Sequence, residues 1–152
     1  MMKSMIQFGA FSAIGLVALG SVFGCTIAAN AAVGAWKKCY LQEKFAPFQL
    51  VIFTGAPLTQ VIYGMILMFI MNGKVDSAAS LARWPVFLFI GFFSGLIMGV
   101  CAWIQGKVSA NCSDAMGETG QGFTNYLIVL GIVETVSIFI MAFSMILIST
   151  IK

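Results

Sequence analysis

The stretch Leu-Gly-Ile-Val-Glu-Thr-Val-Ser-Ile-Phe-Ile at residues 130–140 places a single carboxylate, Glu134, in the middle of an apolar run. In the longer segment Asn125–Ile151, Tyr126 carries the only other ionisable side chain. An ionised carboxylate at the centre of a bilayer costs about 2.5–3.5 kcal/mol on insertion scales, so a chain keeps one where a proton, a cation or a basic partner neutralises it. No Lys or Arg lies in the middle of another apolar stretch, which leaves a proton or a bound cation.

The composition is that of a membrane protein. Of the 152 residues, 61% are hydrophobic and 9% are charged, and the mean hydropathy is +1.02. These values exclude an ordinary soluble domain. The net charge of +3 is small and scattered, so no nucleic-acid partner is expected. Histidine, the commonest metal ligand and general base, is absent. The cysteines show no CxxC spacing and are predicted to be free thiols: Cys25, Cys39, Cys101 and Cys112.

Four segments are long enough to span a bilayer, because a membrane helix needs about 20 apolar residues. The spans are predicted at Met5–Trp36, Ala46–Met71, Trp84–Ala110 and Phe123–Ile151. Polar turns are predicted between them, at residues 37–44, 72–83 and 111–122. Four helices with short connections predict an all-α membrane protein made of two antiparallel hairpins.

The two hairpins look like copies of one unit. Adding 75 to a residue number carries the first onto the second without a gap and aligns seven identical residues: Gly20 with Gly95, Gly24 with Gly99, Val33 with Val108, Ala35 with Ala110, Glu43 with Glu118, Phe48 with Phe123 and Val61 with Val136. We therefore predict two fused hairpins, residues 1–75 and 76–152. The same offset pairs Thr59 with Glu134, so only the second hairpin carries the carboxylate.

The first helix of each hairpin differs from the second. Small residues that let helix backbones approach closely recur in the first helices: Gly20, Gly24, Ala28, Ala31, Ala32 and Ala35, and then Gly91, Gly95 and Gly99. The second helices carry bulkier side chains: Phe53, Tyr63, Phe69, Phe139 and Phe143. This contrast predicts an inner layer of crowded helices and an outer layer that faces lipid.

Oxygen-bearing side chains accompany the carboxylate. Pro57 lacks an N–H and disrupts a helix hydrogen bond about one turn before it, which can free carbonyls to act as ligands. Thr59 and Gln60 place a hydroxyl and an amide beside that distortion. Gln105 adds a second amide from the third helix, and Glu134 adds the carboxylate from the fourth. Oxygen ligands suit hard cations, and one carboxylate among neutral oxygens suits a monovalent ion.

Each of these side chains also has a structural interpretation. Thr59 can bond to its own helix backbone. Gln60 and Gln105 can hydrogen-bond between helices as packing contacts, and Tyr63 can belong to an aromatic belt. Glu134 has the weakest structural interpretation, because carboxylates inside a membrane are functional by default.

At these residues the chain resembles the membrane-rotor proteolipids of rotary ATPases and, more closely, subunit K of bacterial V-type sodium ATPases. The motifs are Pro-Leu-Thr-Gln-Val-Ile-Tyr-Gly at residues 57–64, Gln-Gly-Lys-Val at 105–108 and Val-Glu-Thr at 133–135. The resemblance covers the whole chain. It implies a homo-oligomeric rotor ring that binds Na⁺ and carries it past a stator.

The resemblance also implies a ligand set for Na⁺. The expected ligands are the Ala56 backbone carbonyl and the side chains of Thr59, Gln60, Gln105 and Glu134. Tyr63 is expected to hold the carboxylate in a closed position. The chain departs from the family at Leu58, where a glycine is familiar, and this change affects the Ala56 carbonyl most.

Partners and topology are implied in the same way. The family implies a stator subunit with an essential arginine, central-stalk subunits at the cytoplasmic face, and surrounding lipid. It implies a multi-pass plasma-membrane protein with the first and third turns cytoplasmic and both termini on the opposite side. Counting charges does not orient the chain, because four basic residues lie on each side. The chain has no phosphate-binding loop, so a non-catalytic subunit without a bound nucleotide is expected.

Three other functions predict different features. A proton-carrying ring would use the same glutamate but would need only the carboxyl in an apolar surround. A small four-helix membrane enzyme, such as one using glutathione, would need a basic cluster for its anionic substrate, and Arg83 is the only arginine. A small multidrug exporter would be expected to carry its glutamate in the first helix, which has none.

Overall fold

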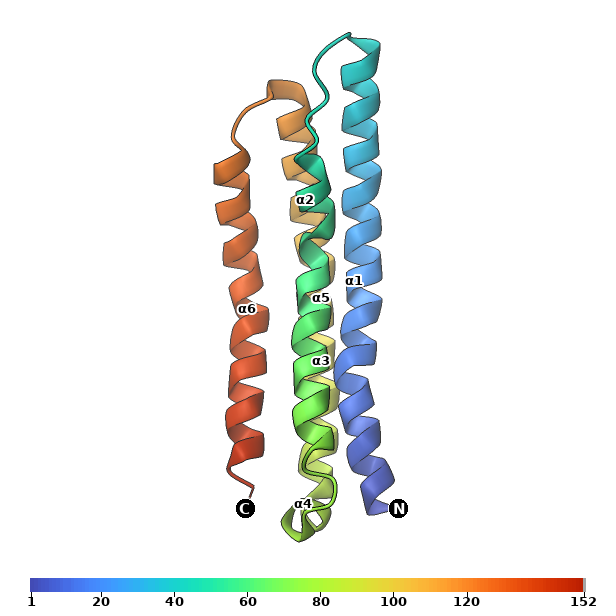
Figure 1. Cartoon of the computed structure of the whole chain (residues 1–152), viewed down its shortest axis with the longest axis vertical. Helices are drawn as coiled ribbons and strands as arrows, with labels where there is room; N and C mark the ends of the chain where they lie inside the picture. Colours follow the sequence, from blue (N-terminus) through green and yellow to red (C-terminus); the bar gives the residue numbers. More distant parts are fainter. Residues whose placement is uncertain (152) are drawn as a thin grey trace.

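The predicted apolar segments fold into long helices that lie side by side (Figure 1). The structure, a computed structural model, describes residues 1–151, and no strand occurs in that range. The elements are α1 (Met2–Leu41), α2 (Leu50–Gly55), the 3-10 turn η1 (Ala56–Leu58), α3 (Thr59–Asn72), α4 (Ala78–Ala82), α5 (Trp84–Thr119) and α6 (Phe123–Ser149). Four helical segments are long and apolar enough to cross a membrane, which confirms the predicted all-α membrane fold with four membrane helices.

The helices α1 and α5 run in the same direction and touch through backbone, as their small residues predicted. A Cβ added at Gly20 would lie 1.9 Å from the Gly99 carbonyl oxygen, and one added at Gly91 would lie 1.9 Å from that of Gly9. Both distances are far shorter than any real contact of a Cβ, so even a methyl group would force the helices apart. Close approach of this kind maximises van der Waals contact between membrane helices, which lack a hydrophobic driving force in lipid.

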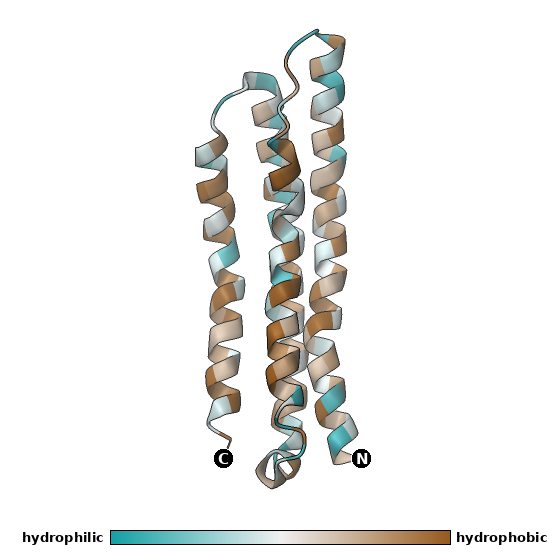
Figure 2. Ribbon diagram, in the orientation of Figure 1, coloured by the Kyte–Doolittle hydropathy of each residue, from teal (hydrophilic) through white to brown (hydrophobic). Residues whose placement is uncertain are grey.

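The helices α3 and α6 form a second layer over this pair. α3 packs on α1, α6 packs on α5, and the two also touch each other. Both helices are hydrophobic over most of their length (Figure 2), and rings are exposed at Phe69, Phe139 and Phe143. Apolar rings on an outward face suit contact with lipid.

The first and third predicted turns are partly wrong, because α1 and α5 are longer than their apolar cores. α1 continues to Leu41 and α5 to Thr119, so residues 37–41 and 111–119 are helical. At 1.5 Å per residue, the 36 residues of α5 span about 54 Å, well beyond the roughly 30 Å hydrocarbon core of a bilayer. α5 stops at Gly120, whose φ of 67° is left-handed, a common glycine end to a helix.

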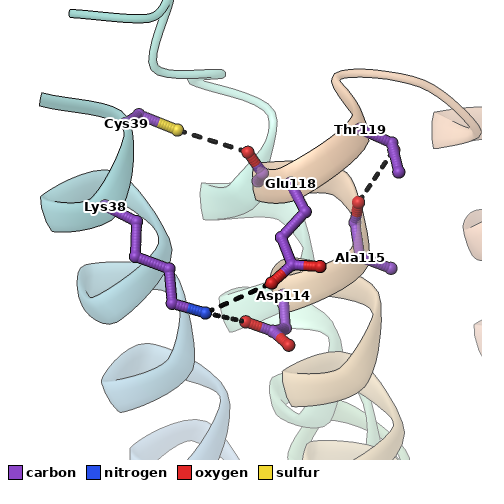
Figure 3. Close-up of polar contacts among 7 residues, drawn as sticks. Lys38, Cys39, Asp114, Ala115, Glu118 and Thr119 are labelled. Carbon is purple, nitrogen blue, oxygen red and sulfur yellow. Dashed lines mark hydrogen bonds and ion pairs between the residues drawn. The ribbon is translucent and has the colours of Figure 1, made fainter. Parts of the chain in front are cut away.

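The two projecting ends stay helical because they pack against each other, with Cys39, Cys112 and Met116 buried. Polar contacts also join them (Figure 3). The Lys38 ammonium lies 3.0 Å from a carboxylate oxygen of Asp114 and 3.4 Å from one of Glu118. The Cys39 thiol, next to Lys38 in the sequence, donates to the Gly117 carbonyl at 3.4 Å. All four cysteines are free thiols, as predicted.

The second membrane segment is interrupted, as Pro57 predicted. It begins at Leu50, four residues later than the predicted Ala46, and η1 separates α2 from α3. The connection that follows was predicted as a turn over residues 72–83, but it contains the short helix α4. At this end of the bundle the Lys3 ammonium lies 2.6 Å from Asp76.

Candidate ion-binding site

The interruption in the second segment shapes the first part of the site. In η1 the Ala56 carbonyl accepts hydrogen bonds from both the Thr59 N–H and the Thr59 hydroxyl, the latter at 2.9 Å. Thr59 therefore makes the local backbone bond that its structural interpretation describes. Its hydroxyl oxygen keeps lone pairs for a further interaction, since it acts as the donor to Ala56. The Ala56 carbonyl has two in-chain donors, so it is the least available of the predicted ligands.

Two buried amides form the base of the site. The Gln60 amide nitrogen donates to the Gln105 side-chain oxygen at 2.6 Å, and both side chains are fully buried. The Gln105 nitrogen donates in turn to the Leu130 backbone carbonyl at 3.2 Å. The Gln60 side-chain oxygen lies 3.4 Å from the Thr59 hydroxyl. These bonds join α3, α5 and α6 and fix which end of each amide faces which neighbour.

The carboxylate lies one turn away from these amides. The Tyr63 hydroxyl of α3 donates to a carboxylate oxygen of Glu134 on α6 at 2.5 Å. Both side chains are half-buried. Among residues 1–151, no second hydrogen bond to the Glu134 side chain is recorded within the chain, so one oxygen remains available as an acceptor.

The spacing along two helices ties these contacts into one site. Gln60 and Tyr63 are three residues apart on α3, and Leu130 and Glu134 are four residues apart on α6, spacings that place side chains on the same helix face. The amides therefore lie in the bundle interior, while the carboxylate lies toward its surface. The predicted side chains form two contacting groups, Thr59 with Gln60 and Gln105, and Tyr63 with Glu134. The predicted ligand set itself stays a prediction.

Two polar groups near the site were not predicted from the sequence. The Leu130 carbonyl, which orients Gln105, belongs to the main chain, and an apolar side chain carries no signal for that role. The Ser137 hydroxyl is fully buried one turn beyond Glu134 and has no hydrogen-bond partner within residues 1–151. Its three-residue spacing from Glu134 was a usable signal, because residues i and i+3 share a helix face.

Comparison with known proteins locates a family in the second half of the chain. Residues 88–147 match the ATP synthase c-subunit family. The match supports a rotor proteolipid. It covers nearly all of α5 and α6, including Gln105 and Glu134, and leaves out the first hairpin. No curated protein matches the chain.

The match covers less than half of the chain, so it shows what the second hairpin resembles. In the matched family the c subunit is a non-catalytic membrane subunit that forms a homo-oligomeric ring and carries ions past a stator subunit. Four apolar helices agree with a multi-pass membrane protein. The predicted duplication of the two hairpins stays a prediction.

Proposed function

We propose that the chain is the Na⁺-carrying rotor subunit of a V-type ATPase, with the ion held at Glu134. The observation that carries the proposal is the buried pair Gln60 and Gln105, which is bonded to the Leu130 carbonyl one helix turn before Glu134. A carboxyl that only binds a proton has no need of two amide oxygens in the bundle interior, whereas Na⁺ needs several oxygen ligands to replace its water.

The ligands follow from the groups that converge at this depth. Glu134 supplies the negative charge, and the side-chain oxygens of Thr59, Gln60 and Gln105 supply neutral ligands. The Ala56 carbonyl contributes by giving up a donor when the ion binds. Tyr63 holds the carboxylate through its hydroxyl, which limits the exposure of the charge.

Neutrality explains how such a subunit moves. Na⁺ and one carboxylate sum to zero charge, which removes the penalty of about 2.5–3.5 kcal/mol for a charged side chain at the bilayer centre. A loaded site can therefore rotate through lipid. Discharge requires a competing cation, and an arginine on the stator supplies one without a change of protonation.

The proposal includes a topology. The first and third connections lie on the cytoplasmic side of the plasma membrane, where they meet the central stalk, and both termini lie on the other side. ATP is hydrolysed, or made, in a separate soluble sector that is coupled to the ring.

Carbodiimide labelling tests the ion site directly, because the reagent attacks a protonated carboxyl. Isolated rings are treated with a hydrophobic carbodiimide at fixed pH, with NaCl or with KCl at equal ionic strength. We expect labelling of Glu134 that Na⁺ slows and K⁺ does not. Glu134→Gln rings identify the labelled residue, since the other four carboxylates remain in them: Glu43, Asp76, Asp114 and Glu118.

A proton-carrying ring is the second candidate. The two donors already on the Ala56 carbonyl favour it, because they lower the number of free oxygens around an ion. In the same experiment, labelling of Glu134 that neither Na⁺ nor K⁺ alters would show that the ring carries protons. Gln60 and Gln105 would then serve only as packing contacts. No labelling at any pH would contradict both rings.

A further inference from the structure

One exposed face of α1 and one exposed face of α5 carry polar side chains among apolar ones. On α1 these positions, the α1 stripe, are Asn30, Val33, Lys37 and Tyr40. On α5 they are Ile104, Lys107, Asn111, Asp114 and Glu118, the α5 stripe. Alternating spacings of three and four residues keep each set on a single helix face. Both stripes are exposed within one chain.

The charges on these stripes are unevenly paired. Lys38 alone serves both Asp114 and Glu118 (Figure 3). Lys37 is exposed and has no ion-pair partner in residues 1–151. Consecutive helix residues point about 100° apart, so Lys37 is turned away from the α5 of its own chain when Lys38 faces it. Two carboxylates therefore share one lysine while a second lysine lies free on the other face.

The register of α1 against α5 gives the height of each stripe. Gly20 meets Gly99, Gly24 meets Gly106 and Ala35 meets Gly117, so facing residues differ by 79 to 82 in number. Because this difference stays within about one helix turn, the two helices stay level along their length. In a ring whose axis is normal to the membrane, every copy has the same heights, so this register also relates α5 of one copy to α1 of the next.

Two polar pairs fall within this register. Lys37 is level with Glu118, and Asn30 is level with Asn111; both pairs differ by 81 in residue number. Within each stripe the two members are seven residues apart, which is two helix turns. One alignment of the stripes therefore satisfies a charge pair and an amide pair together.

From this register and these charges we propose that α1 of one copy packs against α5 of the next, with Lys37 paired to Glu118 and Asn30 hydrogen-bonded to Asn111. The occupant of the α5 stripe is thus a second copy of this chain. The contact is head-to-tail, and such contacts form a ring when the rotation between copies closes. The inference rests on the ring of the proposed function, but not on the identity of the ion.

The pairs select the register of the contact more than they hold it together. Exposed ion pairs contribute little to stability and are screened by salt, whereas misaligned like charges are disfavoured. Lys107 does not disturb this arrangement, because its ammonium lies 4.3 Å from the centre of the Trp103 ring of its own helix.

Zero-length cross-linking tests the proposed contact between Lys37 of one copy and Glu118 of the next. A water-soluble carbodiimide joins a lysine amine to a carboxylate only when the two touch, so isolated rings are treated and then separated under denaturing conditions. We expect a ladder of covalent oligomers whose joining peptide links Lys37 to Glu118. In Lys37→Arg rings the charge remains, but the guanidinium stays protonated and does not couple, so the ladder falls by about tenfold. Lys38→Arg, the matched control, leaves the ladder unchanged.

Charge exchange provides a second measurement that does not use the cross-linker. We expect Lys37→Glu to lower the yield of closed rings in native mass spectrometry, and the double variant Lys37→Glu with Glu118→Lys to restore it. A ladder that depends on Lys38 and not on Lys37, or a double variant no better than the single one, overturns the proposed contact while leaving the ring. Absence of any oligomer in the unmodified protein overturns the ring itself, and the contact with it.

Discussion

The helix that brings Thr59 to the site is interrupted, whereas the helix that brings Glu134 to it is continuous. Before Thr59, the 3-10 turn at Ala56–Leu58 separates α2 from α3, and the Ala56 carbonyl collects two donors there. Around Glu134, α6 runs for 27 residues without a break. The interruption supplies neutral oxygens from backbone and short side chains, and the continuous helix supplies the charge.

This difference explains why one hairpin can do without a carboxylate. The two positions are 75 apart and correspond in the predicted duplication, yet the threonine faces the amide network and the glutamate faces Tyr63. A single charge needs only one cation for neutrality. On the proposed function, each copy therefore carries one ion for four membrane helices.

Removing the charge of the second hairpin has the largest expected effect. Glu134→Gln keeps the length of the side chain and one oxygen but cannot neutralise a cation, so we expect complete loss of Na⁺ uptake by vesicles that hold the assembled complex. Thr59→Ala is the matched change in the first hairpin, and it removes one neutral ligand. We expect the Na⁺ concentration for half-maximal uptake to rise by about tenfold or less, the equivalent of about 1.4 kcal/mol. Equal losses of Na⁺ uptake in the two variants would contradict the proposal that the hairpins have different roles.

Changes to the amide pair separate ion binding from packing. Gln105→Leu leaves the buried Gln60 amide without its partner, which costs about 1–3 kcal/mol; we expect a lower melting temperature of the ring and weaker protection by Na⁺. Replacing both Gln60 and Gln105 by Leu removes the unpaired group, so we expect the melting temperature to recover while protection by Na⁺ stays lost. If protection recovers with stability, the amides serve packing alone.

The tyrosine contact has an intermediate effect. Tyr63→Phe removes the hydroxyl that donates to Glu134, and hydrogen bonds to charged groups contribute about 1.5–3 kcal/mol. We expect faster carbodiimide labelling and, at that energy, a loss of Na⁺ affinity of about tenfold or more. Tyr126→Phe is the control, because the Tyr126 ring packs edge-on against Phe53 with their centres 6.1 Å apart. A similar response to both changes would show that the tyrosines act only through packing.

Much of this fold could be predicted from the sequence, because bilayer thickness and hydropathy constrain membrane helices strongly. The break at Pro57 was predictable from its missing N–H. The ends of α1 and α5 were not, because their helical state depends on packing between distant residues, as where the Cys39 thiol donates to the Gly117 carbonyl 78 residues away. Local polarity there indicates a turn when no partner is known.

The candidate site could also be predicted only in part from the sequence. Glu134 could be predicted as a functional residue from the sequence alone, since a carboxylate inside an apolar membrane segment is functional by default. Tyr63 was assigned to the carboxylate only through the family resemblance, because its own segment fits an aromatic belt equally well. The Leu130 carbonyl could not be predicted. A main-chain acceptor depends on where the backbone lies and not on the side chain of the residue that carries it.

The smallest expected effect comes from making the first hairpin resemble the second. Pro57→Ala restores an N–H that can bond one turn back, which favours a continuous helix in place of η1. Relief of the interruption and loss of the buried proline ring act in opposite directions, so we expect the free energy of unfolding to change by no more than about 1 kcal/mol. Protection by Na⁺ should nevertheless weaken a few-fold, because Ala56 and Thr59 would turn away from the amides.

Leu58→Gly is the matched control: the leucine is exposed, so the change costs about 1 kcal/mol of helix stability but keeps the proline. If Pro57→Ala leaves the protecting Na⁺ concentration unchanged, the interruption is a local packing feature, and the site belongs to Gln60, Gln105 and Glu134 alone.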